Sequence, residues 1–97
     1  MRKVVPNGEY TLDVITQTIL LSDTTLKKEN ILKIHDVDHN CRIYDSDRPL
    51  PGQNISLDPV TPGLFHYDYN GVAAGSTLQI VVELPYIQVI GIDGGSP

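Results

Sequence analysis

Residues 77–84, TLQIVVEL, decide the fold class of this chain. Apolar side chains stand at every second position from Leu78 to Leu84, and polar Gln79 lies between the first two. A period of two places alternate side chains on opposite faces of a β-strand. The pattern predicts a half-buried strand that ends at Pro85. Its inward residues are Leu78, Ile80, Val82 and Leu84, and its outward residues are Thr77, Gln79 and Glu83.

Short segments with the same period recur along the rest of the chain. The predicted strands are residues 10–22, 31–37, 42–44, 54–58, 65–69 and 86–92. The first is either one bent strand or two short strands with a bulge between them. In the second, Leu32 and Ile34 are expected to face inward. The turn residues Asp38-His39-Asn40 then join it to the third strand as a hairpin.

Turn residues separate these strands, and helical periodicity is nearly absent. Eight glycines and seven prolines are scattered among the apolar segments, and Asn70-Gly71 is a strong turn dipeptide. Residues 24–29 are the one candidate for a helix, of at most a single turn. The chain is therefore predicted to be all-β: a small antiparallel β-sandwich, Ig-like or jelly-roll-like, of seven or eight short strands with extended terminal arms.

The chain of 97 residues is long enough for one small domain. We expect an N-terminal arm over residues 1–9, the sandwich over residues 10–85, and a C-terminal arm and flexible tail over residues 86–97. Apolar side chains stand on both faces of the predicted strand 86–92, and a lone sandwich would leave one face in water. The arms are therefore expected to contact another subunit or a partner protein. The predicted contact residues are Arg2, Lys3, Val4, Val5, Tyr86, Ile87, Val89 and Ile90.

Charge and hydropathy exclude two classes of partner. Seven Lys and Arg against twelve Asp and Glu give a net charge of -5, so no nucleic acid is expected, because phosphate binding needs clustered cations. Polar residues and Pro85 interrupt the apolar segment 78–92, which is shorter than a membrane-spanning helix of roughly 18–20 residues, so no membrane is expected. The N-terminal residues lack the apolar run of a secretory signal. Cys41 is the single cysteine, which excludes an internal disulfide and predicts a half-buried strand residue.

Two overlapping patterns in residues 35–47 have the composition of metal sites. His35 and His39, with the acids between them, have zinc-ligand chemistry, but residues four apart on a strand lie roughly 13 Å from each other. Asp36, Asp38 and Asn40 match the start of a calcium loop, although Cys41 stands where the loop needs glycine. The alternative is that these polar residues cap a β-turn. No cofactor is expected, and calcium binding at this turn stays an open alternative.

The chain carries no motif of a known catalytic chemistry. It has no Gly-x-Ser-x-Gly elbow and no glycine-rich phosphate loop, so we expect a protein that is not an enzyme. Phe65, Tyr67 and Tyr69 stand on one face of a predicted strand. Such rings are more often core or interface, but if exposed they would stack on sugars.

The central hairpin resembles a small β-rich module in virion structural proteins of tailed bacteriophages. The shared hairpin pattern is I-L-x-I-x-D-V-x-x-N-x-x-I-Y-D, which residues 31–45 match. Asn30, Gly52, Ile55-Ser56-Leu57 and Leu78-Gln79-Ile80 extend the resemblance, which covers roughly residues 14–84. The chain departs from the pattern in the loop 49–51, the aromatic segment 65–69 and the arm 86–92, which leaves open which part of the virion is meant.

The resemblance implies a non-enzymatic virion protein, because the family has no catalytic residues to transfer. It is most similar to a capsid decoration or cement protein, a separate small gene product that stabilises the head by subunit contacts. A homo-oligomer, the major capsid protein, or both are the implied partners, and the implied location is the virion, assembled in the host cytoplasm. The alternatives are a neck, tail or fibre component, or a β-module that binds carbohydrate or a host surface.

Overall fold

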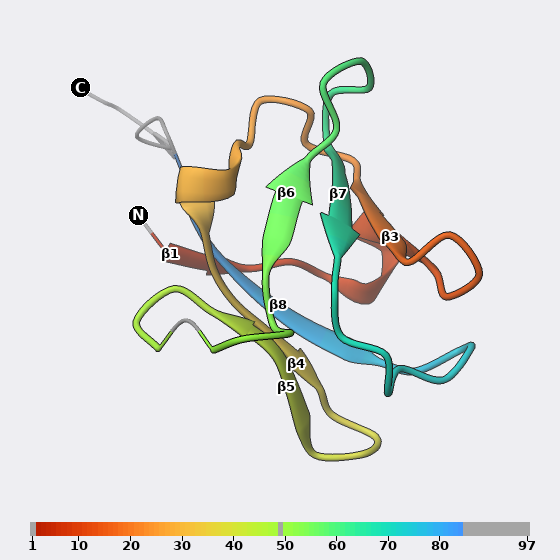
Figure 1. The fold of residues 1–97 in the computed structure, drawn as a ribbon. Coiled ribbons are helices and arrows are strands. Elements are labelled where there is room, and N and C mark those ends of the chain that lie inside the picture. Colours follow the sequence, from red (N-terminus) through yellow and green to blue (C-terminus); the bar gives the residue numbers. More distant parts are fainter. Residues whose placement is uncertain (1, 49, 85–97) are drawn as a thin grey trace.

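The computed structural model describes residues 2–48 and 50–84, which form two four-stranded antiparallel sheets (Figure 1). The strand order is β1-β8-β4-β5 in the first sheet and β2-β3-β7-β6 in the second. The strands are β1 Arg2–Val4, β2 Tyr10–Asp13, β3 Thr18–Leu21, β4 Ile31–Asp36, β5 Cys41–Asp45, β6 Ile55–Leu57, β7 Leu64–Tyr67 and β8 Leu78–Glu83. The prediction of an all-β fold is confirmed, and the two sheets make a small β-sandwich.

The apolar core lies between the two sheets. All four residues predicted to face inward from residues 77–84 are buried, which confirms the reading of that segment. Full burial of a large apolar side chain is worth roughly 1.5–3 kcal/mol, so these positions dominate the stability of the fold. The buried apolar residues are Val5, Ile19, Leu21, Leu26, Ile31, Ile34, Ile43, Tyr44, Ile55, Phe65, Tyr67, Leu78, Ile80, Val82 and Leu84.

Three hairpins build most of the sandwich, and the links between them cross from one sheet to the other. They are β2–β3, β4–β5 and β6–β7. The turn predicted at Asp38-His39-Asn40 is confirmed, and Asn40 takes a positive φ of 51° there. The bulge predicted within residues 10–22 is wrong, because Leu12 pairs with Ile19 across a reversing turn. Oδ1 of Asp13 caps that turn, because it accepts hydrogen bonds from the backbone N–H groups of Ile15 and Thr16.

The inward face of β4 differs from its prediction. Ile31 and Ile34 are buried, whereas Leu32, expected to face inward, is only half-buried. The pairing of β4 with β8 shifts register between Ile31 and Lys33. An irregularity of this kind breaks the simple alternation, so a strict period of two assigns Leu32 to the wrong face.

The predicted N-terminal arm, residues 1–9, is largely part of the sandwich. β1 pairs with β8 through Arg2 opposite Glu83 and Val4 opposite Val81. The N–H of Val5 donates to the carbonyl of Ile80 at 2.8 Å. The boundary expected at residue 10 therefore does not match the structure, because residues 2–5 add an edge strand.

Two short 3-10 helices complete the fold, η1 Asn7–Glu9 and η2 Lys28–Asn30. The single helical turn expected within residues 24–29 corresponds to η2, and it lies slightly later in the chain. Within residues 2–48 and 50–84, no helix has the length and apolar content needed to span a membrane. At Asn70-Gly71 the structure has no turn; the turn before β8 falls at residues 74–75, where Gly75 has a φ of 80°.

Candidate functional site

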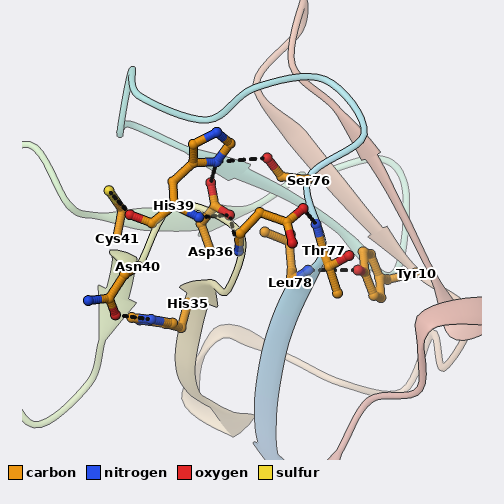
Figure 2. Close-up of polar contacts among 10 residues, drawn as sticks. Tyr10, His35, Asp36, His39, Asn40, Cys41, Ser76, Thr77 and Leu78 are labelled. Atoms are coloured by element: carbon orange, nitrogen blue, oxygen red, sulfur yellow. Dashed lines mark hydrogen bonds and ion pairs between the residues drawn. The ribbon is translucent and has the colours of Figure 1, made fainter.

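A polar cluster gathers at the β4–β5 turn around the carboxylate of Asp36 (Figure 2). Asp36 is the last residue of β4, and its side chain is fully buried. Its Oδ1 accepts the backbone N–H groups of Asp38 at 3.1 Å and His39 at 3.3 Å. Its Oδ2 lies 3.0 Å from Nδ1 of His39. A buried carboxylate needs such partners, because an unpaired charge in the interior is costly.

The same cluster connects the turn to the loop before β8 and to the second sheet. Oδ2 of Asp38 accepts the N–H of Thr77 at 2.9 Å. The hydroxyl oxygen of Tyr10, on β2, accepts the N–H of Leu78 at 2.8 Å. Figure 2 shows these groups converging from the β4–β5 turn, the start of β8 and β2. The cluster therefore joins three segments that are far apart in the sequence.

The side chains that the sequence offers as metal ligands form hydrogen bonds at the β4–β5 turn. Both oxygens of Asp36 face donors within the turn, and His35 Nε2 lies 3.2 Å from Oδ1 of Asn40. His39 instead faces Asp36, so the two histidines have different partners. In the described part of the chain, no three His, Cys, Asp or Glu side chains are placed to hold a metal ion together. The geometry is that of a capped turn.

Sequence reasoning missed that Asp36, His39 and Ser76 come together in space. Ser76 Oγ lies 3.4 Å from Nδ1 of His39, and Asp36 Oδ2 lies 3.0 Å from the same nitrogen. In a hydrolytic triad the carboxylate holds one ring nitrogen while the other takes the proton of the hydroxyl. Here both partners face one nitrogen, so the three residues lack the arrangement of a nucleophile and its base. No spacing in the sequence signals this set.

Cys41 begins β5 as a half-buried residue, which confirms its prediction. Its thiol donates to the carbonyl of His39 at 3.3 Å. A hydrogen bond with Cys41, followed by the negative charge of its thiolate form, raises the pKa of Tyr69. The cysteine thus belongs to the same end of the sandwich as the Asp36 cluster.

The aromatic face on β7 belongs to the core. Phe65 and Tyr67 are only 1% and 3% exposed, and Tyr69 packs against the core as a partly buried residue. Burial, followed by the charge of Asp13, raises the pKa of Tyr67. Rings enclosed between two sheets are not available to stack on a sugar.

The predicted contact residues of the N-terminal segment have different environments. Arg2 is exposed on β1, with Nε 3.9 Å from Oε1 of Glu83. Lys3 Nζ donates to Glu9 Oε1 at 3.1 Å, and Val4 is 55% exposed. Val5 is in the core, so it is not a contact residue in the described fold. The other predicted contact residues, Tyr86, Ile87, Val89 and Ile90, lie outside the described residues.

A groove that sequence reasoning did not anticipate opens beside η2, where β5 and β6 end the two sheets. It has a volume of about 590 Å³ and opens widely to solvent. Its floor is apolar, formed by Ile31, Leu57 and the ring of Tyr44. Burial, followed by the charge of Asp45, raises the pKa of Tyr44. We call this feature the η2 groove.

Comparison with known proteins adds no assignment: the chain matches no protein-family model, no curated protein and no solved structure.

Proposed function

We propose that this chain is a non-enzymatic structural protein of a tailed-bacteriophage virion, most specifically a capsid decoration or cement protein. A neck, tail or fibre component is the nearest alternative within the same proposal. The resemblance of residues 14–84 to virion modules motivates it, and the two-sheet architecture is compatible with it. Such a protein works by burying surface against its neighbours and needs no catalytic group.

The observation that carries the proposal is the exposed edge strand β1. Among the described residues it is the terminal strand of its sheet, paired on one side with β8. Arg2 and Val4 are both exposed on it. An edge strand presents backbone donors and acceptors that a strand from another protein can pair with. Because β1 is only three residues long, further contacts must come from outside it.

The apolar residues 86–92 are the proposed source of those further contacts. Ile87 and Val89 alternate with Tyr86 and Ile90, so a strand formed by this segment would carry apolar side chains on both faces. Both faces would then need burial against a partner. In this proposal the segment packs on a neighbouring subunit of the assembly, and β1 adds to the attachment. Binding of carbohydrate through Phe65 and Tyr67 is not favoured, because those rings are buried.

The test is to locate the protein and then remove its attachment. Antibodies raised against the purified chain are applied to particles from the organism that encodes it, and immunogold labelling identifies heads, tails or neither. Labelling of heads is expected. A protein found only in fractions free of virion parts would refute the proposed function.

Substitution in the arm then tests the mechanism. Ile87→Asp and Val89→Asp are expected to abolish binding to purified heads while the far-UV circular dichroism of the sandwich stays unchanged. Ile15→Asp is the matched control, because Ile15 is 92% exposed in the β2–β3 turn and should tolerate a charge. If the two arm variants unfold, residues 86–92 are core rather than contact residues, and the mechanism is wrong.

A further inference from the structure

We propose that the η2 groove is the receptor for residues 86–92 of a second copy of this chain. The inference rests on the proposed function, since both assign docking to the same segment. It goes further by naming the receiving surface and the partner. The groove combines an apolar floor with two lysines, Lys27 and Lys28, at its rim.

The shape of the groove follows from where the sandwich is left open. Within residues 2–48 and 50–84, β5 and β6 are terminal strands of the two sheets, and the groove is lined by residues from both. Tyr44 and Ser46 line it from β5 and the turn that follows, and Leu57 lines it from β6. η2 contributes Lys28 and Glu29 to the lining and contacts β6. The groove opens widely to solvent, so a segment of another copy can enter it from outside.

The chemistry of the segment matches that of the groove. Residues 86–92, YIQVIGI, supply apolar side chains for the floor formed by Ile31, Tyr44 and Leu57. Asp93 follows directly and carries the charge opposite to the lysines of the rim. Glu29 also lines the rim, so the two lysines there outnumber one acid.

The position of η2 favours a second copy over the chain's own segment. The carbonyl of Glu83 accepts a hydrogen bond from Nδ2 of Asn30 at 3.0 Å, so β8 already passes η2 at its last residue. Leu84 precedes Pro85, and a residue before proline is biased towards extended backbone. The bias of Leu84 towards extended backbone opposes a sharp reversal at this point, and the proposal therefore takes a second copy as the occupant. When two copies related by a twofold axis exchange their segments, each groove is filled by the segment of the other copy.

The first test uses the full chain in solution and measures mass against concentration by analytical ultracentrifugation. The wild-type protein is expected to form a dimer. Ser46→Trp fills the groove from an exposed rim position and is expected to raise the dissociation constant on the order of tenfold or more. Ser56→Trp is the matched control, because Ser56 is exposed on β6 away from the groove, and it should leave dimerisation unchanged.

A charge exchange tests the lysine rim separately. Lys28→Glu is expected to weaken dimerisation several-fold at low salt, and adding Asp93→Lys should restore it. Lys33→Glu makes the same charge change away from this groove and should have no such effect. Failure of Asp93→Lys to restore binding would overturn the pairing of the rim with residue 93.

Cross-linking separates a second copy from the chain's own segment. In a Cys41→Ser background, one protein carries Ser46→Cys and the other carries Gln88→Cys. After mild oxidation of the mixture, a disulfide-linked heterodimer is expected on a non-reducing gel. With both substitutions in one chain, an internal disulfide in a monomer would show docking within the chain and overturn the inference.

Two outcomes distinguish this inference from the proposed function. A wild-type monomer at all accessible concentrations, or a Ser46→Trp variant that still dimerises, overturns the groove assignment even if the protein is found on virions. Dimerisation through the groove by a protein that is absent from virions refutes only the proposed function.

Discussion

Replacement of Asp36 tests the polar cluster most directly. Its buried carboxylate accepts two backbone N–H groups of the β4–β5 turn and contacts His39. A hydrogen bond to a charged group is worth about 1.5–3 kcal/mol. His39 is half-exposed and keeps access to water, so the two backbone contacts dominate. For Asp36→Ala we expect the free energy of unfolding to fall by about 3 kcal/mol.

Asp36→Asn separates the loss of charge from the loss of the acceptor. Its side-chain oxygen can still accept both backbone N–H groups, so the expected loss is only about 1 kcal/mol. A domain of this size has a total stability of about 5–15 kcal/mol, so both variants should remain folded at neutral pH. Asp13→Ala, at the exposed β2–β3 turn, is the control and should lose less than Asp36→Ala.

Urea denaturation followed by far-UV circular dichroism measures these differences. With a denaturant slope of about 1.5 kcal/mol/M, a loss of 3 kcal/mol lowers the midpoint by about 2 M. Equal midpoints for wild type and Asp36→Ala would refute the reasoning, because the carboxylate would then contribute nothing to the turn. A larger loss for Asp36→Asn than for Asp36→Ala would show that the carboxylate does not act as a hydrogen-bond acceptor there.

Two further predictions concern Asp58 and Gly63. A hydrogen bond with His66, followed by the backbone N–H groups of Thr61 and Val60, lowers the pKa of Asp58 to about 2. The ionised carboxylate therefore contributes fully to the stability of the folded protein above the ordinary pKa of 3.8, and this contribution is lost as pH falls through about 2. A carboxyl titration by NMR should show this low midpoint, and it should rise in His66→Ala; a wild-type midpoint near 4 would contradict it. Gly63 has a φ of 82°, and a Cβ there would lie 2.8 Å from the carbonyl oxygen of Leu21, so Gly63→Ala should cost about 2 kcal/mol or more in thermal or urea unfolding. Gly75→Ala shares the positive φ without a close neighbour and should cost less; equal losses would remove the role of the contact.

Local patterns predicted most of the strands because alternation is a property of neighbouring residues. The inward face of residues 77–84 and the turn at Asp38-His39-Asn40 are both correct. The errors fall where one residue breaks the local rule. The register shift beside Leu32 reverses its face, and the capped turn after Asp13 makes a hairpin where a bulge was expected.

The candidate sites were less predictable than the strands. The aspartates of the turn suggested calcium, but their oxygens accept hydrogen bonds from nearby backbone groups. Val5 was expected at a contact surface, yet β1 pairs with β8 and carries it into the core. In each case the side chain was identified correctly as polar or apolar, and its partner was unknown.

The sequence by itself determined that this protein is built from short antiparallel strands and that β8 has one buried face. Only the tertiary structure decided which sheet each strand joins, that Asp36 is buried, and that a groove opens between β5, β6 and η2. The physical reason is the range of the interactions. Alternating burial is set by neighbours two residues away, whereas contacts such as Tyr10 with Leu78 join positions 68 residues apart and exist only when the two sheets pack.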